Sequence, residues 1–502
     1  MKIFLLNSKG SFIKVVNKNL FQSAIFGFNW MIISKATQFI LQFLLLMVLA
    51  RLLTANEFGL MGLALSIITI TQVLSTMGIG PAIVRRKTID DEFLQSAFFL
   101  SIVLNFFFAV LIYLLASTIS VFFNMSHLEE ILKALTSIFI IKSFGIVATF
   151  LLQRNMSFKI LAFQNVFSYL GYALIGIIFA FAGYGVWSLV FAQIAQAIIF
   201  TLIAISVQKH KKTIYINKKL LKELFYFGGG FSLAKIFNQI ALQGDNLVIG
   251  RSLGSDALGV YSRAYQIMVM PTNLFGEVID KVLFPVLSKI QDENDKLRYW
   301  FVNSQALLIL ILSPIVAIFT IYTEAIVMVI LGADWLDAVP PLQILTLGLF
   351  FRTLYKISDS MVRAKGAVYK RANIQLVYAI FVFAGAIIGQ FWGLVGVSVG
   401  VTVAITINYI LMMSLSLSLI STSWSEVFRS LLKPSLFLLA NIIILSVSYS
   451  WLVKFPSILS IIFAGLVQII MGIVIFRFYP SLFMSKESEY IAIKIKSKIF
   501  KR

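Results

Sequence analysis

Long apolar segments separated by short polar breaks recur from one end of the chain to the other. A helix of about 20 apolar residues spans the roughly 30 Å hydrocarbon core of a bilayer, and these segments are too long and too uniformly apolar for barrel strands. The pattern therefore predicts an all-α integral membrane protein. Its fourteen expected transmembrane helices cover residues 23–51, 57–80, 93–122, 129–152, 160–182, 186–207, 221–251, 256–282, 300–322, 338–363, 370–389, 393–418, 431–452 and 457–479.

The remaining segments fall between or outside these helices. Residues 323–337 are expected to form a short interfacial segment on the external side. Residues 1–22 are basic but lack a long apolar core with a cleavage site, so we interpret them as a retained cytosolic lead-in. The basic tail 481–502 is expected to lie on the cytosolic membrane surface.

Composition and charge agree with a membrane protein. Of the 502 residues 60% are hydrophobic and only 13% are charged, far from the averages of soluble domains. The net charge of +21 is concentrated in alternate breaks, as the positive-inside rule requires when both termini are cytosolic. The excess of basic residues therefore faces the anionic cytosolic leaflet of the membrane, which accounts for the positive charge. No nucleic-acid partner is expected.

A repeat with a spacing of two hundred residues divides the chain. Arg51 and Arg251 end the first and seventh predicted helices, and Gly59 and Gly259 begin the second and eighth. The ungapped match predicts a parallel internal repeat of two six-helix lobes, although chance similarity between apolar helix ends is the alternative. The expected lobes are residues 23–219 and 220–420, followed by two further helices in 421–480.

The chain lacks the residues that most enzyme and metal sites need. It has no cysteine and only two histidines, which lie far apart, so we expect neither a metal site nor a cofactor. Neither a P-loop motif nor a G-x-S-x-G motif is present. The sequence therefore predicts a protein that is not an enzyme.

Charged residues inside the predicted membrane segments are the main functional signal. A lysine at the centre of a membrane helix costs roughly 2.5–3.5 kcal/mol, so it needs a polar cavity or a partner. Lys35 and Lys235 lie two hundred residues apart, midway along one helix of each lobe. We expect both side chains to face one central cavity. The alternative is that they extend to the headgroups, although each lies some 15–20 Å from either helix end.

The predicted helix 338–363 carries the densest set of charges. Arg352, Lys356, Asp359 and Arg363 are spaced by four, three and four residues, which places them on one helical face. Asp359 can pair with Lys356 or Arg363, whereas Arg352 has no local partner. An ordinary ion-paired stripe near the cytosolic surface is the alternative.

Further cationic candidates are Arg263 and Lys142, and Asp245 is a candidate for ion coupling. A pair between Arg263 and Asp245 is the competing interpretation. Polar candidates for the cavity lining are Gln38, Gln42, Asn238 and Gln239, although buried amides more often hold helices together. The mostly positive set favours an anionic ligand that contains phosphate or pyrophosphate.

Two long stretches, 50–99 beginning ARLLTANEFGLMGLA and 244–293 beginning GDNLVIGRSLGSDALGVYSRA, carry a resemblance to a known family. They resemble the starts of the two lobes in bacterial polysaccharide exporters of the multidrug/oligosaccharidyl-lipid/polysaccharide (MOP) superfamily. Within that superfamily the chain is most similar to the branch that exports colanic and teichuronic acid-like polymers, relatives of Wzx-type O-antigen flippases. The resemblance covers nearly the whole chain. The family offers no sharp catalytic motif, so the cavity residues rest on the physical argument.

The resemblance implies a flippase in a bacterial cytoplasmic membrane that works by alternating access. Its implied cargo is an oligosaccharide repeat unit linked by pyrophosphate to a polyprenol, used for exopolysaccharide or lipopolysaccharide synthesis. Membrane lipids and other polysaccharide assembly proteins are the further partners expected. A drug or small-cation antiporter of the same superfamily is one alternative, although it should carry a more acidic cavity. A membrane polysaccharide polymerase or ligase is another, although it should carry a long external loop.

Overall fold

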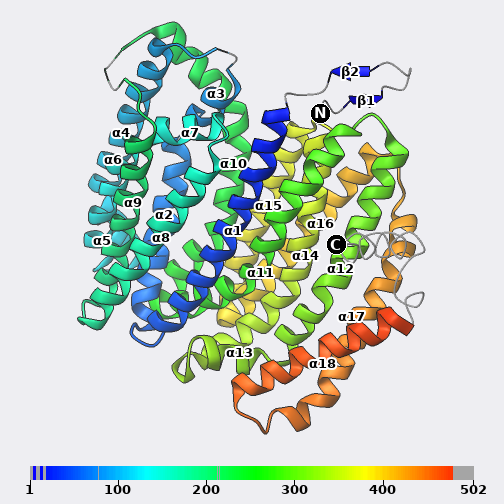
Figure 1. Ribbon diagram of the computed structural model, residues 1–502. Coiled ribbons are helices and arrows are strands. Elements are labelled where there is room, and N and C mark those ends of the chain that lie inside the picture. The colour runs from blue at the N-terminus through cyan, green and yellow to red at the C-terminus, as the bar shows by residue number, and fades with distance from the viewer. Residues whose placement is uncertain are drawn as a thin grey trace. The chain divides into compact units, whose positions relative to one another are not determined.

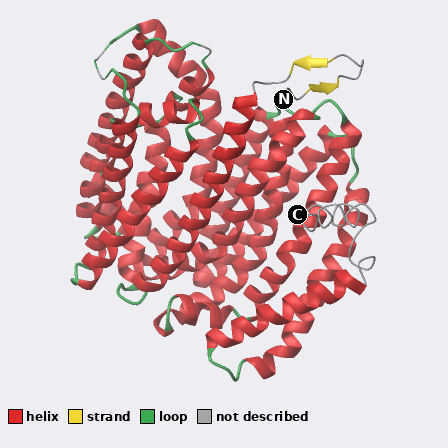
Figure 2. Cartoon of the chain, in the orientation of Figure 1, coloured by secondary structure: helices red, strands yellow, loops and turns green. Residues whose placement is uncertain are grey.

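The computed structural model describes residues 4–6, 12–14, 18–76, 78–86, 88–211, 213 and 215–478, which are helical almost throughout (Figure 2). Within the predicted lead-in, β1 (Phe4–Leu6) and β2 (Phe12–Lys14) form a two-stranded antiparallel pair. The predicted tail 481–502 lies outside the described residues.

Every one of the fourteen predicted segments overlaps helix in the structure. The helices of the first two hundred residues are α1 (Lys18–Leu49), α2 (Ala55–Ser75), α3 (Ile79–Arg85), α4 (Asp91–Phe123), α5 (Leu128–Leu135), α6 (Ser137–Ser143), α7 (Ile146–Arg154), α8 (Phe158–Phe181) and α9 (Val186–Val207). The remaining helices are α10 (Lys218–Ser252), α11 (Gly254–Lys289), α12 (Asn294–Ile321), α13 (Thr323–Ile330), η1 (Ala333–Ala338), α14 (Val339–Ala364), α15 (Val368–Gly389), η2 (Gln390–Trp392), α16 (Gly393–Leu419), α17 (Trp424–Leu452) and α18 (Ser457–Phe478).

Hydropathy separates these helices into two groups. Among the described residues eight helical segments, with α15 and α16 taken together, are long and apolar enough to cross a membrane, or nine with one bent pair. The number fourteen therefore stays a prediction. Helices α10, α11 and α14 fall outside this set. Their polar residues lower the mean hydropathy, and the same helices carry most of the predicted site residues.

The bent pair lies where one continuous helix was expected over 129–152. The structure divides this segment into α5, α6 and α7, with a bend of 47° at the break between Leu128–Ser143 and Ile146–Arg154. Gly145 occupies the break, and a Cβ atom there would lie 3.2 Å from the Thr201 side chain of α9. The close approach of α9 is a tertiary constraint that the apolar pattern of the segment does not contain.

The chain forms two compact units. The first comprises Met1–Leu49, Ile67–Val121 and Ser126–Leu233, and the second comprises Ala50–Ser66, Phe122–Met125 and Ala234–Arg502. The first three turns of α2 thus belong to the second unit. Within that unit α14 packs against α11, α12 and α16, and α15 packs against α16 (Figure 1). More than half of the α14 residues are buried, so this charged helix lies inside the unit rather than on its surface.

The expected interfacial segment 323–337 is a pair of short helices, α13 and η1, at one end of the second unit. Arg51 donates hydrogen bonds to the carbonyl groups of Val329 (3.0 Å) and Ile330 (3.5 Å) at the C-terminus of α13, where a cation is favoured. Trp335 donates its indole N–H to the Ala50 carbonyl at 2.8 Å. These contacts join the segment to the residues that connect α1 to α2.

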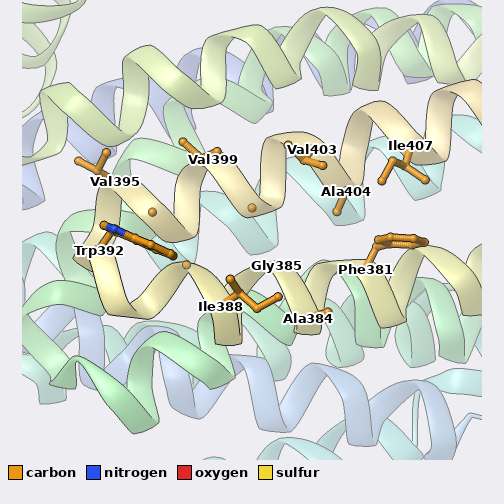
Figure 3. Close-up of a pocket in the computed structure, with 13 residues that line it drawn as sticks. Phe381, Ala384, Gly385, Ile388, Trp392, Val395, Val399, Val403, Ala404 and Ile407 are labelled. Atoms are coloured by element: carbon orange, nitrogen blue, oxygen red, sulfur yellow. The ribbon is translucent and has the colours of Figure 1, made fainter.

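Helices α15 and α16 approach so closely that their backbones touch. A Cβ atom on Gly389 would lie 2.4 Å from the Gly396 carbonyl oxygen, and one on Gly385 would lie 2.7 Å from the Gly400 oxygen. Small residues permit such contacts between membrane helices. An apolar groove of about 540 Å³ runs beside the crossing, with Trp392 at one end and Phe381 near the other (Figure 3).

Candidate functional site

Arg352 lies on α14 inside the second unit, and its neighbours are tyrosines. Its guanidinium donates a hydrogen bond to the Tyr265 hydroxyl of α11 at 2.6 Å and lies 5.4 Å from the centre of that ring. Tyr378 of α15 also interacts electrostatically with Arg352. No carboxylate of the described residues lies within 4.0 Å of this guanidinium. A neutral hydroxyl satisfies one N–H group without forming an ion pair, so Arg352 can attract an anion.

Asp245 of α10 is 2% exposed and belongs to the same polar cluster. One carboxylate oxygen accepts the Tyr261 hydroxyl of α11 at 2.8 Å, and the other accepts the Asn246 backbone N–H at 2.8 Å. The competing interpretation of the sequence paired Asp245 with Arg263. The structure gives Asp245 a tyrosine partner instead, and Arg263 lies 4.5 Å above the Phe58 ring of α2.

Asp359 forms the predicted ion pair with Arg363 and a second pair with Arg371. Its carboxylate lies 2.9 Å from Arg363 of α14 and 2.5 Å from Arg371 of α15. Tyr355 also donates to Asp359, at 3.2 Å. Arg371 lies in the first turn of α15, within the predicted helix 370–389. Asp359 is therefore a buried anion shared by two cations, which joins α14 to α15.

A chain of amides continues this network toward α10. Gln375 of α15, which is fully buried, donates to the Tyr355 hydroxyl at 3.0 Å. Asn238 of α10 donates to the Gln375 carbonyl at 2.8 Å. Asn238 was a candidate for cavity lining. Its hydrogen bond joins α10 to α15, as expected from the alternative that buried amides hold helices together. Gln239, the neighbouring candidate, is partly exposed.

The other predicted cations of the second unit have different surroundings. Lys235 of α10 is exposed, whereas Lys356 of α14 is partly buried. The aliphatic part of Lys356 covers Gly276 of α11, where an added Cβ atom would lie 3.3 Å from Lys356 Cε. Lys356 thus has its stem packed between two helices.

The first unit holds the remaining predicted residues. Lys35, Gln38 and Gln42 all lie on α1 and are partly buried. Lys142 of α6 donates a hydrogen bond to the Gln72 carbonyl of α2 at 3.2 Å. Because Lys35 belongs to the first unit and Lys235 to the second, their meeting in one cavity stays a prediction.

Sequence reasoning missed the tyrosines that organise the second unit. Tyr261 and Tyr265 are one helical turn apart in GVYSRAYQ, a spacing that places them on one face of α11. That spacing was the available signal, but apolar segments of this chain contain many aromatic residues. The partners lie on α10 and α14, so only the packing of three helices distinguishes these two tyrosines from others.

Comparison with known proteins gives consistent matches over most of the chain. The family model described as "Polysaccharide biosynthesis protein" matches residues 48–340. The teichuronic acid biosynthesis protein TuaB of Bacillus subtilis is 28% identical over 435 residues, which cover 84% of this chain and 89% of that protein. The lipopolysaccharide biosynthesis protein WzxC of Escherichia coli is 25% identical and covers 83% of this chain and 85% of its own length.

Among solved structures, the lipid II flippase MurJ in an inward closed conformation superimposes with a TM-score of 0.73. The match has 17% sequence identity and covers 89% of this chain and 98% of that one. At this identity the likeness shows a shared fold. The predicted all-α membrane architecture is thereby confirmed.

Proposed function

The chain belongs to the polysaccharide biosynthesis protein family whose model matches residues 48–340, and from this membership we propose that it is a flippase for lipid-linked oligosaccharides. Its cargo is a repeat unit joined by pyrophosphate to a polyprenol. The protein carries the headgroup across the bacterial cytoplasmic membrane by alternating access, with both chain termini in the cytosol. The product feeds the synthesis of a surface polysaccharide.

One observation carries this proposal: Arg352 lies inside the second unit, and the hydrogen-bond partner of its guanidinium is a neutral tyrosine. Dehydrating a phosphate group is the main barrier to spontaneous flipping, since an ion loses its hydration when it enters hydrocarbon. A guanidinium with unused N–H groups replaces part of that hydration and suits phosphate geometry. The carboxylate of Asp359 is already paired with two arginines, which does not favour a small-cation antiporter.

Lys35 and Lys235 are proposed as the second part of the binding site, one from each repeat. In this arrangement they bind the pyrophosphate or acidic sugars together with Arg352, while Arg263, Lys356 and Lys142 add to the positive potential. The polyprenyl chain stays in lipid. Asp245 is the proposed position for a coupling ion. Energy comes from an ion gradient or from consumption of the product outside the cell.

The test replaces Lys35 and Lys235 together by glutamine in cells whose own copy of the gene is deleted. We expect surface polymer to be lost and the lipid-linked repeat unit to accumulate on the cytosolic leaflet, while the variant inserts normally. A matched control replaces Lys296 and Lys454, both exposed, and should preserve polymer. Unchanged polymer in the Lys35→Gln/Lys235→Gln variant would remove both lysines from the mechanism.

A further inference from the structure

We propose that Tyr261 and Tyr265 are positioning residues that keep Asp245 from neutralising Arg352. This inference rests on the proposed function, because it explains how the protein keeps a cation available for the anionic headgroup. Both tyrosines lie on α11, and their hydroxyls reach Asp245 of α10 and Arg352 of α14. Each binds one member of an ion pair that does not form.

The geometry places one hydroxyl against each charge. Tyr261 donates to Asp245 at 2.8 Å, and Tyr265 accepts from Arg352 at 2.6 Å. The two rings are 5.9 Å apart between centroids and inclined by 30°. Tyr261 is fully buried, so its hydroxyl has little freedom to turn elsewhere.

The carboxylate of Asp245 is satisfied without Arg352. One oxygen accepts Tyr261 and the other accepts the Asn246 backbone N–H. In a medium of low dielectric constant the attraction between opposite charges is strong, so a buried carboxylate near a guanidinium tends to collapse into a salt bridge. The titratable and charged groups that interact electrostatically with Asp245 are Tyr261 and Tyr265 of α11, Arg352 of α14 and Tyr378 of α15. The hydroxyl of Tyr261 satisfies one of the two carboxylate oxygens, so it competes with a salt bridge to Arg352.

The two tyrosines of α11 therefore have different roles. Tyr261 retains the anion on α10, and Tyr265 orients the cation on α14 without cancelling its charge. A guanidinium presents five N–H donors, and only part of this set is used by tyrosine. The remaining donors fit the oxygens of a pyrophosphate. Loss of either hydroxyl should let Asp245 and Arg352 pair with each other and weaken anion binding.

The experiment measures binding of farnesyl pyrophosphate to the purified full-length protein in detergent by calorimetry. We expect the Tyr261→Phe variant to bind about tenfold more weakly, the size expected for losing one hydrogen bond to a buried charged group. Adding Asp245→Asn to this variant removes the competing anion and should restore binding to within about twofold of the unmodified protein. If Tyr261→Phe fails to fold, the same comparison is made with Tyr265→Phe, measured alone and combined with Asp245→Asn.

The control is Tyr409→Phe, which removes a buried hydroxyl from α16 in the same unit and should leave binding unchanged. The proposal is overturned if Asp245→Asn fails to restore binding in both tyrosine variants, because a merely structural role would not depend on that carboxylate. Two other outcomes would contradict the proposed function itself. In one, the unmodified protein does not bind farnesyl pyrophosphate; in the other, Arg352→Gln leaves this binding unchanged.

Discussion

Gly59 and Gly259, two hundred residues apart, each lie against the backbone of the other's helix. A Cβ atom on Gly59 would be 1.8 Å from the Ser255 carbonyl oxygen, and one on Gly259 would be 1.8 Å from the Ala55 oxygen. Ala55 and Ser255 are themselves two hundred residues apart. The contact is therefore symmetric in the repeat, and it explains why both copies have glycine: any side chain would separate α2 from α11.

Replacing Gly59 by alanine should separate the N-terminal turns of α2 and α11. The chain has no cysteine, so a cysteine pair introduced at Asn56 and Ser255, whose side chains hydrogen-bond at 2.6 Å, reports this separation without background. We expect crosslinking by a short bifunctional reagent to fall several-fold in Gly59→Ala, because the new methyl group overlaps a carbonyl.

The matched control for this prediction is Gly62→Ala, one turn along the same helix. A Cβ atom there would meet only the Ser262 side chain at 3.7 Å, an ordinary contact. Crosslinking should stay as in the parent pair. Equal crosslinking in the Gly59→Ala and Gly62→Ala proteins would contradict the close crossing.

The helices could be predicted from the sequence because each apolar run is long enough to define one element by itself. The division of 129–152 could not, because the break at Gly145 depends on the approach of Thr201 from α9. The same limit applies to the site. The spacing along α14 predicted the pair between Asp359 and Arg363, whereas the partnership with Arg371 requires the packing of α14 against α15.

The prediction that Arg352 lacks a local partner agrees with the structure for a reason that the sequence does not contain. Tyr265 lies 87 residues away and reaches Arg352 only because α11 packs against α14. Periodicity identifies residues that share a helical face, but it does not identify the face that opposes them. The position of Lys35 relative to Lys235 is a question of the same kind.

The ion pairs of Asp359 should contribute measurably to stability. Asp359→Asn leaves Arg363 and Arg371 without their shared anion, and removing one partner of a buried pair costs about 3–5 kcal/mol. This value is an upper limit, since both arginines keep some exposure. We expect a lower temperature of thermal unfolding in detergent. Arg371→Gln should have a smaller effect, because Arg363 still holds the carboxylate.

The control for the Asp359 prediction is the exposed pair between Arg298 and Glu426, with side chains 45% and 39% accessible. Exposed pairs contribute about 0–1 kcal/mol. Arg298→Gln should therefore leave the unfolding temperature nearly unchanged. If Asp359→Asn were as mild as Arg298→Gln, the network would be neutral for stability.

Trp335 should matter through its indole N–H as well as its ring. Trp335→Phe keeps an aromatic ring near Phe58, whose centroid is 5.5 Å from that of Trp335, but it leaves the Ala50 carbonyl without its donor. An unsatisfied buried acceptor costs about 1–3 kcal/mol. We expect thermal unfolding at a lower temperature than in Trp451→Phe, where the tryptophan is 72% exposed. Equal unfolding temperatures of the two variants would show that the hydrogen bond from Trp335 to the Ala50 carbonyl does not contribute to stability.

Gly389 should be intolerant of substitution because its helix touches α16 through the backbone. A side chain at this position would start 2.4 Å from the Gly396 carbonyl oxygen, so Gly389→Leu forces α15 and α16 apart. Overpacking of this kind costs about 1–3 kcal/mol or more, since backbone cannot rotate away as a side chain can. Gly465→Leu on α18 is the matched control, because no atom lies within 4 Å of its Cβ position. The temperature of thermal unfolding in detergent should therefore fall for Gly389→Leu and stay unchanged for Gly465→Leu. A similar fall in both variants would indicate a general effect of leucine rather than of the α15–α16 crossing.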